Sequence, residues 1–228
     1  MKLTLHIDYH TQWGESLKVC GTTGAEWPMQ PKAGTDRWIA HLDIEAKDLH
    51  LEYNYTVVRD GAVVRREWGG PHVLDCSGDV HCCTVIDHWN DMPADKPFYS
   101  SAFTSCVFRR ESPAANRPEA MAGKVLFEVE APMVAPGHVL ALSGSTPSLG
   151  SWNTEKAVRM NDAAFSLWTA SVDARDLTAA SEFKFVVLDA ADGHVVAWEN
   201  GQNRRLGIAP AIGEATGVAG RRIRNPFG

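Results

Sequence analysis

Hydrophobic and polar residues alternate in short runs along most of this 228-residue chain. The clearest example is EFKFVVL at residues 182–188, followed by an Asp-Gly turn and HVVAW at residues 194–198. Such alternation is typical of β-strands, and Asp-Gly is typical of the turn in a β-hairpin. The two phenylalanines of the first run should face a core, whereas Lys184 and Trp198 should face the other side. The hairpin therefore predicts an outer surface with an aromatic ring beside polar groups.

The same pattern occurs twice in the chain. Residues 52–68 and 182–198 both begin with Glu-aromatic-X-aromatic and both end in tryptophan 16 positions later. Trp38 and Trp168 stand 130 positions apart, as do the starts of these two segments. A repeat unit of this length is a complete domain, because solenoid repeats have periods of ~20–50 residues. Turn-forming clusters separate the alternating segments and no amphipathic helix intervenes, which predicts an all-β fold of two tandem immunoglobulin-like antiparallel β-sandwiches.

Breaks in the pattern give the expected domain boundaries. The first β-sandwich is expected at residues 1–95 and the second at residues 121–212. Residues 96–120 combine an aromatic half with a Pro/Ala/Asn-rich half, which predicts a partly ordered linker. Residues 213–228 are rich in Gly and Arg and are expected to be a tail that leads to a further domain of a longer protein.

Composition narrows the choice of partners. The net charge is −6 and no Lys/Arg run precedes the last residues, which argues against a nucleic-acid or anionic-membrane partner. Neither the first residues nor any later stretch carries the continuous apolar run of a secretory signal or a membrane span. The five cysteines are an odd number and are too sparse for a disulfide scaffold. These features predict a cytoplasmic location.

Catalytic and metal-binding chemistry finds little support in the sequence. The Cys and His residues between positions 76 and 88 lack a C-x-x-C pair, so ordinary buried thiols are favoured over a zinc site. Fingerprints of hydrolases, P-loops and dinucleotide-binding sites are missing. A glycosidase-type pair of catalytic carboxylates remains an open alternative, although two small sandwiches offer no evident cleft to hold such a pair. We expect no catalytic residue, metal or cofactor in this chain.

Four of the eight tryptophans stand at equivalent places in the two copies. Trp38 and Trp168 each open an alternating strand, which predicts core positions. Trp68 and Trp198 could be buried or could form exposed platforms. The polar loop ENGQNR that follows Trp198 favours an exposed platform in the second copy.

The remaining candidates lie in turns. Trp152 belongs to a run of turn formers, where it either plugs the end of the sandwich or stands in solvent. Trp13 precedes a Gly-Glu-Ser turn, and Pro136 occupies the equivalent place 123 positions later. Because a core position would not readily exchange Trp for Pro, we expect Trp13 at the surface. The role of Trp27 stays open.

The second copy closely resembles carbohydrate-binding module family 20, whose members are starch-binding β-sandwiches. The resemblance lies in GSTPSLGSWNTEKAVRM at residues 144–160, EFKF at residues 182–185 and WENGQNR at residues 198–204. It implies a first glucan-binding site formed by Trp152, Lys184, Trp198 and Asn203, with Glu199 adjoining. It also implies a second site that uses an aromatic before the Gly-Glu turn, which Trp13 matches and Pro136 does not.

The first copy resembles the same family in a divergent form. Its loop before Trp38 is shorter, Asn54 replaces the lysine, and the loop after Trp68 is replaced. Trp68 is what is left of a first site, and whether Trp27 belongs to it stays open. The resemblance implies complementary modules, each with the site that the other has lost.

The tandem pair, together with FYSSAFTSCVFRR, resembles the N-terminal region of amylomaltase-type 4-α-glucanotransferases, which continue into a catalytic barrel of glycoside hydrolase family 77. A barrel of that kind needs ~250 residues, more than this chain has left. The resemblance implies a non-catalytic part that binds starch, glycogen or malto-oligosaccharides and has the catalytic domain as its partner. A protein-interaction or regulatory role without sugar binding is the alternative, because such sandwiches also serve as docking modules.

Overall fold

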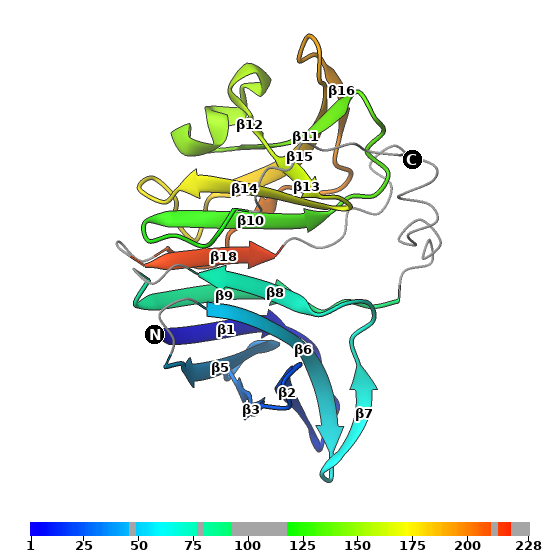
Figure 1. The fold of residues 1–228 in the computed structure, drawn as a ribbon, viewed down its shortest axis with the longest axis vertical. Coiled ribbons are helices and arrows are strands. Elements are labelled where there is room, and N and C mark those ends of the chain that lie inside the picture. The colour runs from blue at the N-terminus through cyan, green and yellow to red at the C-terminus, as the bar shows by residue number, and fades with distance from the viewer. Residues whose placement is uncertain (46–48, 77–79, 93–117, 211–213, 220–228) are drawn as a thin grey trace.

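The computed structural model describes residues 1–45, 49–76, 80–92, 118–210 and 214–219, and their regular structure is almost entirely β (Figure 1). The helices among these residues are the short 3₁₀ helices η3 (Pro147–Trp152) and η4 (Thr154–Lys156). No helix in this part of the chain is long and apolar enough to cross a membrane. The prediction of an all-β fold is confirmed.

The described residues of each copy of the repeat form nine strands. The first module contains β1 (Lys2–Asp8), β2 (Glu15–Gly21), β3 (Glu26–Pro28), β4 (Gln30–Pro31), β5 (Arg37–Asp43), β6 (Leu49–Arg59), β7 (Ala62–Arg66), β8 (His72–Cys76) and β9 (Cys82–His88). The second contains β10 (Lys124–Glu130), β11 (His138–Gly144), β12 (Val158–Arg159), β13 (Asn161–Ala164), β14 (Leu167–Asp173), β15 (Glu182–Asp189), β16 (Val195–Trp198), β17 (Arg204–Arg205) and β18 (Ala215–Ala219).

The two modules repeat the same strand order in two layers. One layer of the first module is β9-β1-β5-β4, and the other is β3-β2-β6-β7 with β8 also paired to β6. The second module has β18-β10-β14-β13 in one layer and β12-β11-β15-β16, with β17 on β15, in the other. Among the described strands of each module, only the first and last pair with each other in parallel, so these are largely antiparallel β-sandwiches.

The inner layers of the two modules form one continuous sheet of eight strands. Strand β18 pairs in parallel with β9, with Ala215 opposite Cys83 and Val218 opposite Ile86 (Figure 1). Residues 215–219, which the sequence placed in a tail, are therefore the strand that joins the modules.

The outer layers lie on opposite faces of this shared sheet. Val85 belongs to the core of the first module, whereas its neighbour Ile86 belongs to the core of the second. Leu126 of β10 and Ala215 of β18 in turn pack into the first core. Because adjacent residues of a strand point to opposite faces, each module contributes side chains to the core of the other.

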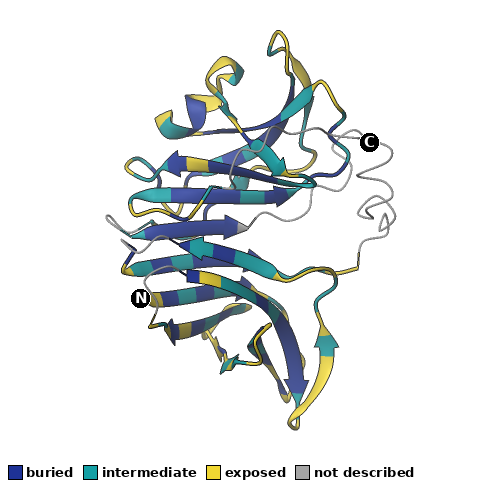
Figure 2. Cartoon of the chain, viewed as in Figure 1, coloured by how far each residue is buried: buried dark blue, intermediate teal, exposed yellow. Residues whose placement is uncertain are grey.

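Both cores follow the alternation of the sequence (Figure 2). Phe183 and Phe185 are buried on the inner face of β15, as predicted. Trp38 and Trp168 are buried too, and the Trp168 indole Nε1 donates a hydrogen bond to the Ala131 carbonyl at 3.1 Å. Both core assignments are confirmed.

The connection between the modules lies mostly outside the described residues, and so does the predicted packing of its aromatic half. Its described end is tied to the first module, since the Ala120 amide donates to the Asp75 carbonyl at 2.9 Å. Four cysteines, namely Cys20, Cys76, Cys82 and Cys83, are free thiols, and Cys106 lies outside the described residues.

Candidate functional site

Trp198 lies on the outer face of the second module. It is the last residue of β16 and stands opposite Val186 of β15, on the face that points away from the two phenylalanines. There it is partly exposed and packs against a small cluster that includes Ala141, Val186 and Leu188. The alternation of the hairpin thus places this indole as predicted, with one part resting on the sheet and another reaching solvent.

Trp152 is presented to solvent by a strained turn. Gly150, Ser151 and Trp152 have φ angles of 79°, 50° and 61° in succession, and such positions cost a non-glycine residue ~1–3 kcal/mol. Glycine is required at 150, because a Cβ there would come within 2.7 Å of the Lys156 carbonyl oxygen. The Thr146 carbonyl holds the turn by accepting hydrogen bonds from two of its amides. The Trp152 side chain remains 37% exposed.

The segment after the Trp152 turn reaches the same outer layer as Trp198. The segment that follows the turn returns along β11 as β12, and Ala157 just before β12 packs in the cluster beneath Trp198. The exposed Trp152 and the partly exposed Trp198 are therefore both connected to this outer layer.

Polar groups border this surface in the loop after Trp198. The Lys184 Nζ donates to the Gly201 carbonyl at 2.6 Å, and the Asn203 Nδ2 donates to Glu182 at 3.0 Å. Glu182 also pairs with Arg205, and together these donors hold the pKa of Glu182 below its usual range. The loop is thus anchored to β15 while Asn203 stays exposed.

Glu199 is turned inward rather than toward the surface. Its side chain is only 10% exposed and pairs with the Arg204 guanidinium, with Arg204 Nε at 2.9 Å. Its amide donates to the Phe185 carbonyl at 2.9 Å, and its carboxylate accepts from the Phe185 amide at 3.4 Å. Glu199 fixes the residue next to Trp198 in place. A sugar contact at Glu199 stays a prediction that this geometry does not favour.

In the first module, Arg66 occupies the place that Trp198 has in the second. Thr56 stands opposite Arg66, just as Val186 stands opposite Trp198. The sequence correspondence between Trp68 and Trp198 is therefore wrong by two positions.

Glu67 confirms this register. It accepts from the Tyr55 amide at 2.7 Å, as Glu199 does from Phe185. The cause is the length of the hairpin turn, because Val58 pairs with Val63 whereas Leu188 pairs with Val195, two residues farther along. A sugar contact at Trp68 stays a prediction, and the equivalence to Trp198 no longer supports it.

Trp27 has a structural position. It packs against the first core, and its ring atoms lie 3.3 Å from where a Cβ of Gly21 would stand. At the equivalent glycine of the second module, Gly144, the neighbouring side chain is Leu149. Trp27 therefore fills the end of the first sandwich, as Leu149 fills the end of the second.

Trp13 is 100% exposed, as expected for a surface residue. Its turn is firmly anchored, since the buried Glu15 side chain accepts from the Gln12 amide and pairs with Arg59 and Arg65. The amide hydrogen bond and the two guanidinium groups hold the pKa of Glu15 below its usual range. The structure thus holds one indole away from the protein on a rigid support.

A buried polar network occupies the first module near the junction, and sequence reasoning missed it. The hydroxyls of Tyr53 and Tyr55 both donate to Asp87 at 2.6 Å, and His72 lies 3.1 Å from Glu67. Burial alone would lower the pKa of His72, but the neighbouring carboxylates of Asp87 and Glu67 outweigh it and raise this pKa to about 9. The sequence held one signal for this network. Asp87 is a charged residue on the same face of β9 as the buried Cys83 and Val85, which indicates a buried charge that needs partners.

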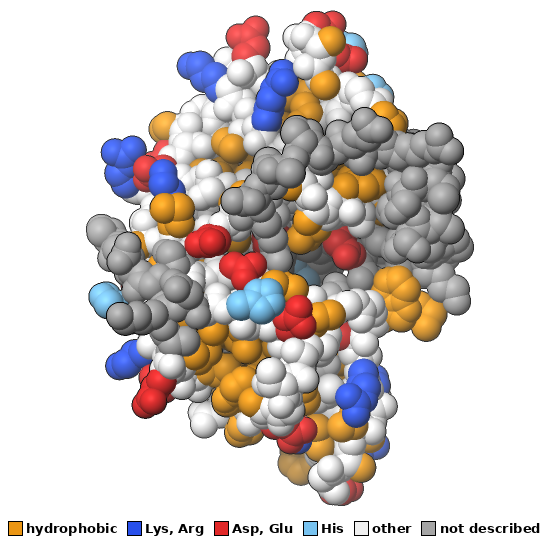
Figure 3. Space-filling view, viewed as in Figure 1, with side chains coloured by type: hydrophobic (Ala, Val, Ile, Leu, Met, Phe, Trp, Pro, Cys, Tyr) orange, Lys and Arg blue, Asp and Glu red, His pale blue; other side chains and the backbone are white. Residues whose placement is uncertain are grey.

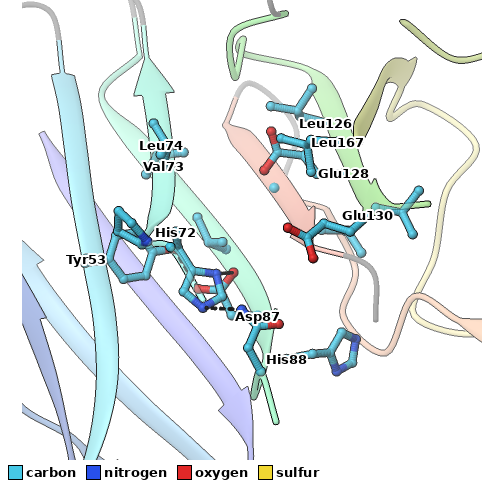
Figure 4. Close-up of a pocket in the computed structure, with 17 residues that line it drawn as sticks. Tyr53, His72, Val73, Leu74, Asp87, His88, Leu126, Glu128, Glu130 and Leu167 are labelled. Atoms are coloured by element: carbon cyan, nitrogen blue, oxygen red, sulfur yellow. Dashed lines mark hydrogen bonds and ion pairs between the residues drawn. The ribbon is translucent and has the colours of Figure 1, made fainter. Parts of the chain in front are cut away.

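This network forms one wall of a cavity of about 160 Å³ between the modules (Figure 4). Tyr53, His72 and Asp87 lie on one side, and Glu128 and Glu130 of β10 lie on the other. In the space-filling view, acidic side chains and histidine gather near the middle of the face, where the modules meet (Figure 3). The network belongs to the junction and not to the surface with the exposed indoles.

One group in the described part of the chain has the composition of a cation site. Asp189, Asp192 and His194 have potential ligand atoms within 4.8 Å of one another at the β15–β16 turn. Both carboxylates already accept amide hydrogens of this turn, and the Arg159 guanidinium reaches the Ala190 carbonyl at 3.5 Å. The structure of the turn explains the grouping without a metal ion.

A family model matches the second module directly. The family model of the starch binding domain, carbohydrate-binding module family 20, matches residues 123–217. The matched segment begins before β10 and ends within β18, so it includes both exposed indoles and the polar loop. The resemblance seen in the second copy is confirmed.

Relatives extend the similarity over most of the chain. The chain is 28% identical over 230 residues to 4-alpha-glucanotransferase DPE2 of Oryza sativa subsp. japonica. The alignment covers 90% of this chain and 24% of the relative. It therefore spans about a quarter of that protein's length.

Two solved structures show similarity at lower identity. The family 20 module of the maltotetraose-forming amylase from Pseudomonas saccharophila STB07 is 24% identical, with a TM-score of 0.34 over 42% of this chain and 98% of that one. The gamma-CGTase from alkalophilic Bacillus clarkii is 17% identical, with a TM-score of 0.39 over 91% of this chain and 23% of that one.

Proposed function

We propose that this chain binds α-1,4-glucans such as starch, glycogen or malto-oligosaccharides. The observation that carries the proposal is that Trp152 is exposed and Trp198 partly exposed in the module that matches the starch binding domain. Each pyranose ring has an apolar face that a flat indole can cover. Two platforms on one surface suit the curved ribbon of an α-1,4-glucan better than a flat chain.

Lys184 and Asn203 lie in or beside the loop after Trp198, and in this proposal they bond the hydroxyl groups of the sugar. By analogy with base stacking, each platform contributes ~1–3 kcal/mol, and each neutral hydrogen bond adds ~0.5–1.5 kcal/mol. After the entropic cost of association, these contributions give a dissociation constant of about 10 μM to 1 mM for the site. In the first module, Trp13 provides a separate and simpler platform.

In a longer protein, the chain would hold an enzyme on its polymeric substrate. The similarity to a 4-alpha-glucanotransferase four times as long supports this context, with a catalytic domain as the partner. Weak sites become effective in such an arrangement, because the second contact with one polymer occurs at a roughly millimolar effective concentration.

Calorimetry with β-cyclodextrin tests the proposal. Trp198→Ala and Trp152→Ala each remove one platform and should lower the affinity of the second module by about ten- to a hundredfold. Val64→Ala, which changes an exposed hydrophobic residue on β7 of the first module, is the matched control and should bind like the original protein. Unchanged binding in both tryptophan variants would refute the site, and failure of the unmutated protein to bind any glucan would favour a docking role.

A further inference from the structure

The two proposed glucan surfaces lie at opposite ends of the molecule. Trp198 ends β16, which is at the top of Figure 1. The Trp13 turn is joined to the end of β6 near the bottom of the same view, because Glu15 pairs with Arg59 at 2.9 Å. The long axis of the molecule runs between these two ends.

The connection between the ends is rigid. Strand β18 is hydrogen-bonded to β9 on one side and to β10 on the other, so the shared sheet runs without a break through both modules. The cores also interlock, since Ile86 of the first module packs into the second core and Leu126 of the second packs into the first. A flexible linker would let two sites approach one segment of ligand, whereas this arrangement keeps them apart.

The support beneath Trp13 indicates that this indole binds an external partner. A side chain that is 100% exposed gains nothing from the core, yet its turn is fixed by the buried Glu15 and two arginines. Its equivalent in the second module, Pro136, offers no such platform. The two ends therefore present one aromatic surface each, and the surfaces are built differently.

We propose that this protein bridges two separate glucan polymers and does not clamp a single short oligosaccharide between its modules. The proposal rests on the proposed function, because both ends must bind glucan. The partner is a particle or polymer with many accessible glucan chains. A single-site binder would coat such a particle, whereas a rigid two-ended binder links particles into a network.

Light scattering of glycogen particles mixed with the protein tests the bridge. The scattering should rise to a maximum at an intermediate ratio of protein to glycogen and fall again in excess protein or on addition of β-cyclodextrin. Trp13→Ala should lose this rise while it still sediments with insoluble starch, although more weakly. Val64→Ala should link particles like the unmutated protein.

The outcomes separate the two proposals. If the unmutated protein sediments with starch but never raises the scattering, the bridge is refuted and glucan binding stands. If Trp13→Ala links particles as well as the unmutated protein, the bridge is also refuted, because self-association would then be the cause. If the unmutated protein binds neither starch nor glycogen, glucan binding itself fails.

Discussion

His72 should make the stability of the first module depend on pH. Its ring lies 3.1 Å from Glu67 and 3.6 Å from Asp87, and it stacks on Tyr53 with a centroid distance of 5.3 Å. Burial opposes its charge, but the two carboxylates dominate and raise its pKa from 6.5 to about 9. Because the folded pKa lies above the unfolded one, the stabilisation is complete below pH 6.5 and disappears as the pH rises through about 9.

The size of the effect follows from the same two pKa values. The interval between 6.5 and about 9 corresponds to about 3 kcal/mol, since each pKa unit is worth about 1.4 kcal/mol. The stabilisation should be about 3 kcal/mol at pH 6 and about 1.4 kcal/mol at pH 8, and nearly absent at pH 9.5. His72→Gln removes the titrating ring but keeps a donor for Glu67. The gap in unfolding free energy between the two proteins should therefore narrow by about 3 kcal/mol from pH 6 to pH 9.5.

Denaturant unfolding followed by tryptophan fluorescence at several pH values gives this gap. Tyrosines and thiols titrate in both proteins and cancel in the difference. His81→Gln, which changes an exposed histidine of the same module, is the control and should show a constant gap. A gap between His72→Gln and the unmutated protein that stays constant from pH 6 to pH 9.5 would show that His72 does not carry a buried charge.

Two further predictions concern the second module. Arg204→Met leaves the mostly buried Glu199 carboxylate without its partner, which should destabilise the module by about 3 kcal/mol in denaturant unfolding and weaken β-cyclodextrin binding in calorimetry. Equal stability and affinity would argue against Glu199 as a positioning residue. Gly144→Ala would place a Cβ 2.4 Å from the Glu182 carbonyl oxygen and should cost more than about 2 kcal/mol, whereas Gly70→Ala, with open space around it, should cost less than about 1 kcal/mol.

The strands and both cores could be predicted because they depend on local alternation. In the first half of β15, the buried Phe183 and Phe185 alternate with the half-buried Glu182 and Lys184, and the same rule placed Trp198 on the outer face before any contact was known. The exposure of Trp13 could be predicted for a related reason, since its exchange for proline in the second copy excludes a core position.

The register error at Trp68 shows where such reasoning fails. A hairpin turn that is two residues longer moves the next strand by two positions and leaves the alternation unchanged, so nothing in the pattern reveals the shift. The position of Arg66 appears only when the strand pairing is known. The inward orientation of Glu199 was hidden in the same way, because its partner Arg204 lies on another strand.

The junction of the modules could not be predicted, because it depends on contacts between residues that are far apart in the sequence. Residues 215–219 are short, small and far from β9 along the chain, and the signal for their pairing is spread over two strands. The buried network of His72 and Asp87 required both the strand order and the register. Local propensity specifies strands, whereas long-range pairing specifies which of them meet.

The shared sheet also determines how the modules can be separated for study. Cutting the chain between them leaves β9 and β18 as open edges, with unpaired amide and carbonyl groups along each. It also uncovers Ile86 and Leu126, which are buried only because the other module covers them. Each isolated half would therefore expose an unpaired edge strand beside an apolar patch, and we expect it to self-associate or aggregate. A charged or proline substitution on the exposed edge of β9 or β18 is the natural safeguard in such a truncated protein.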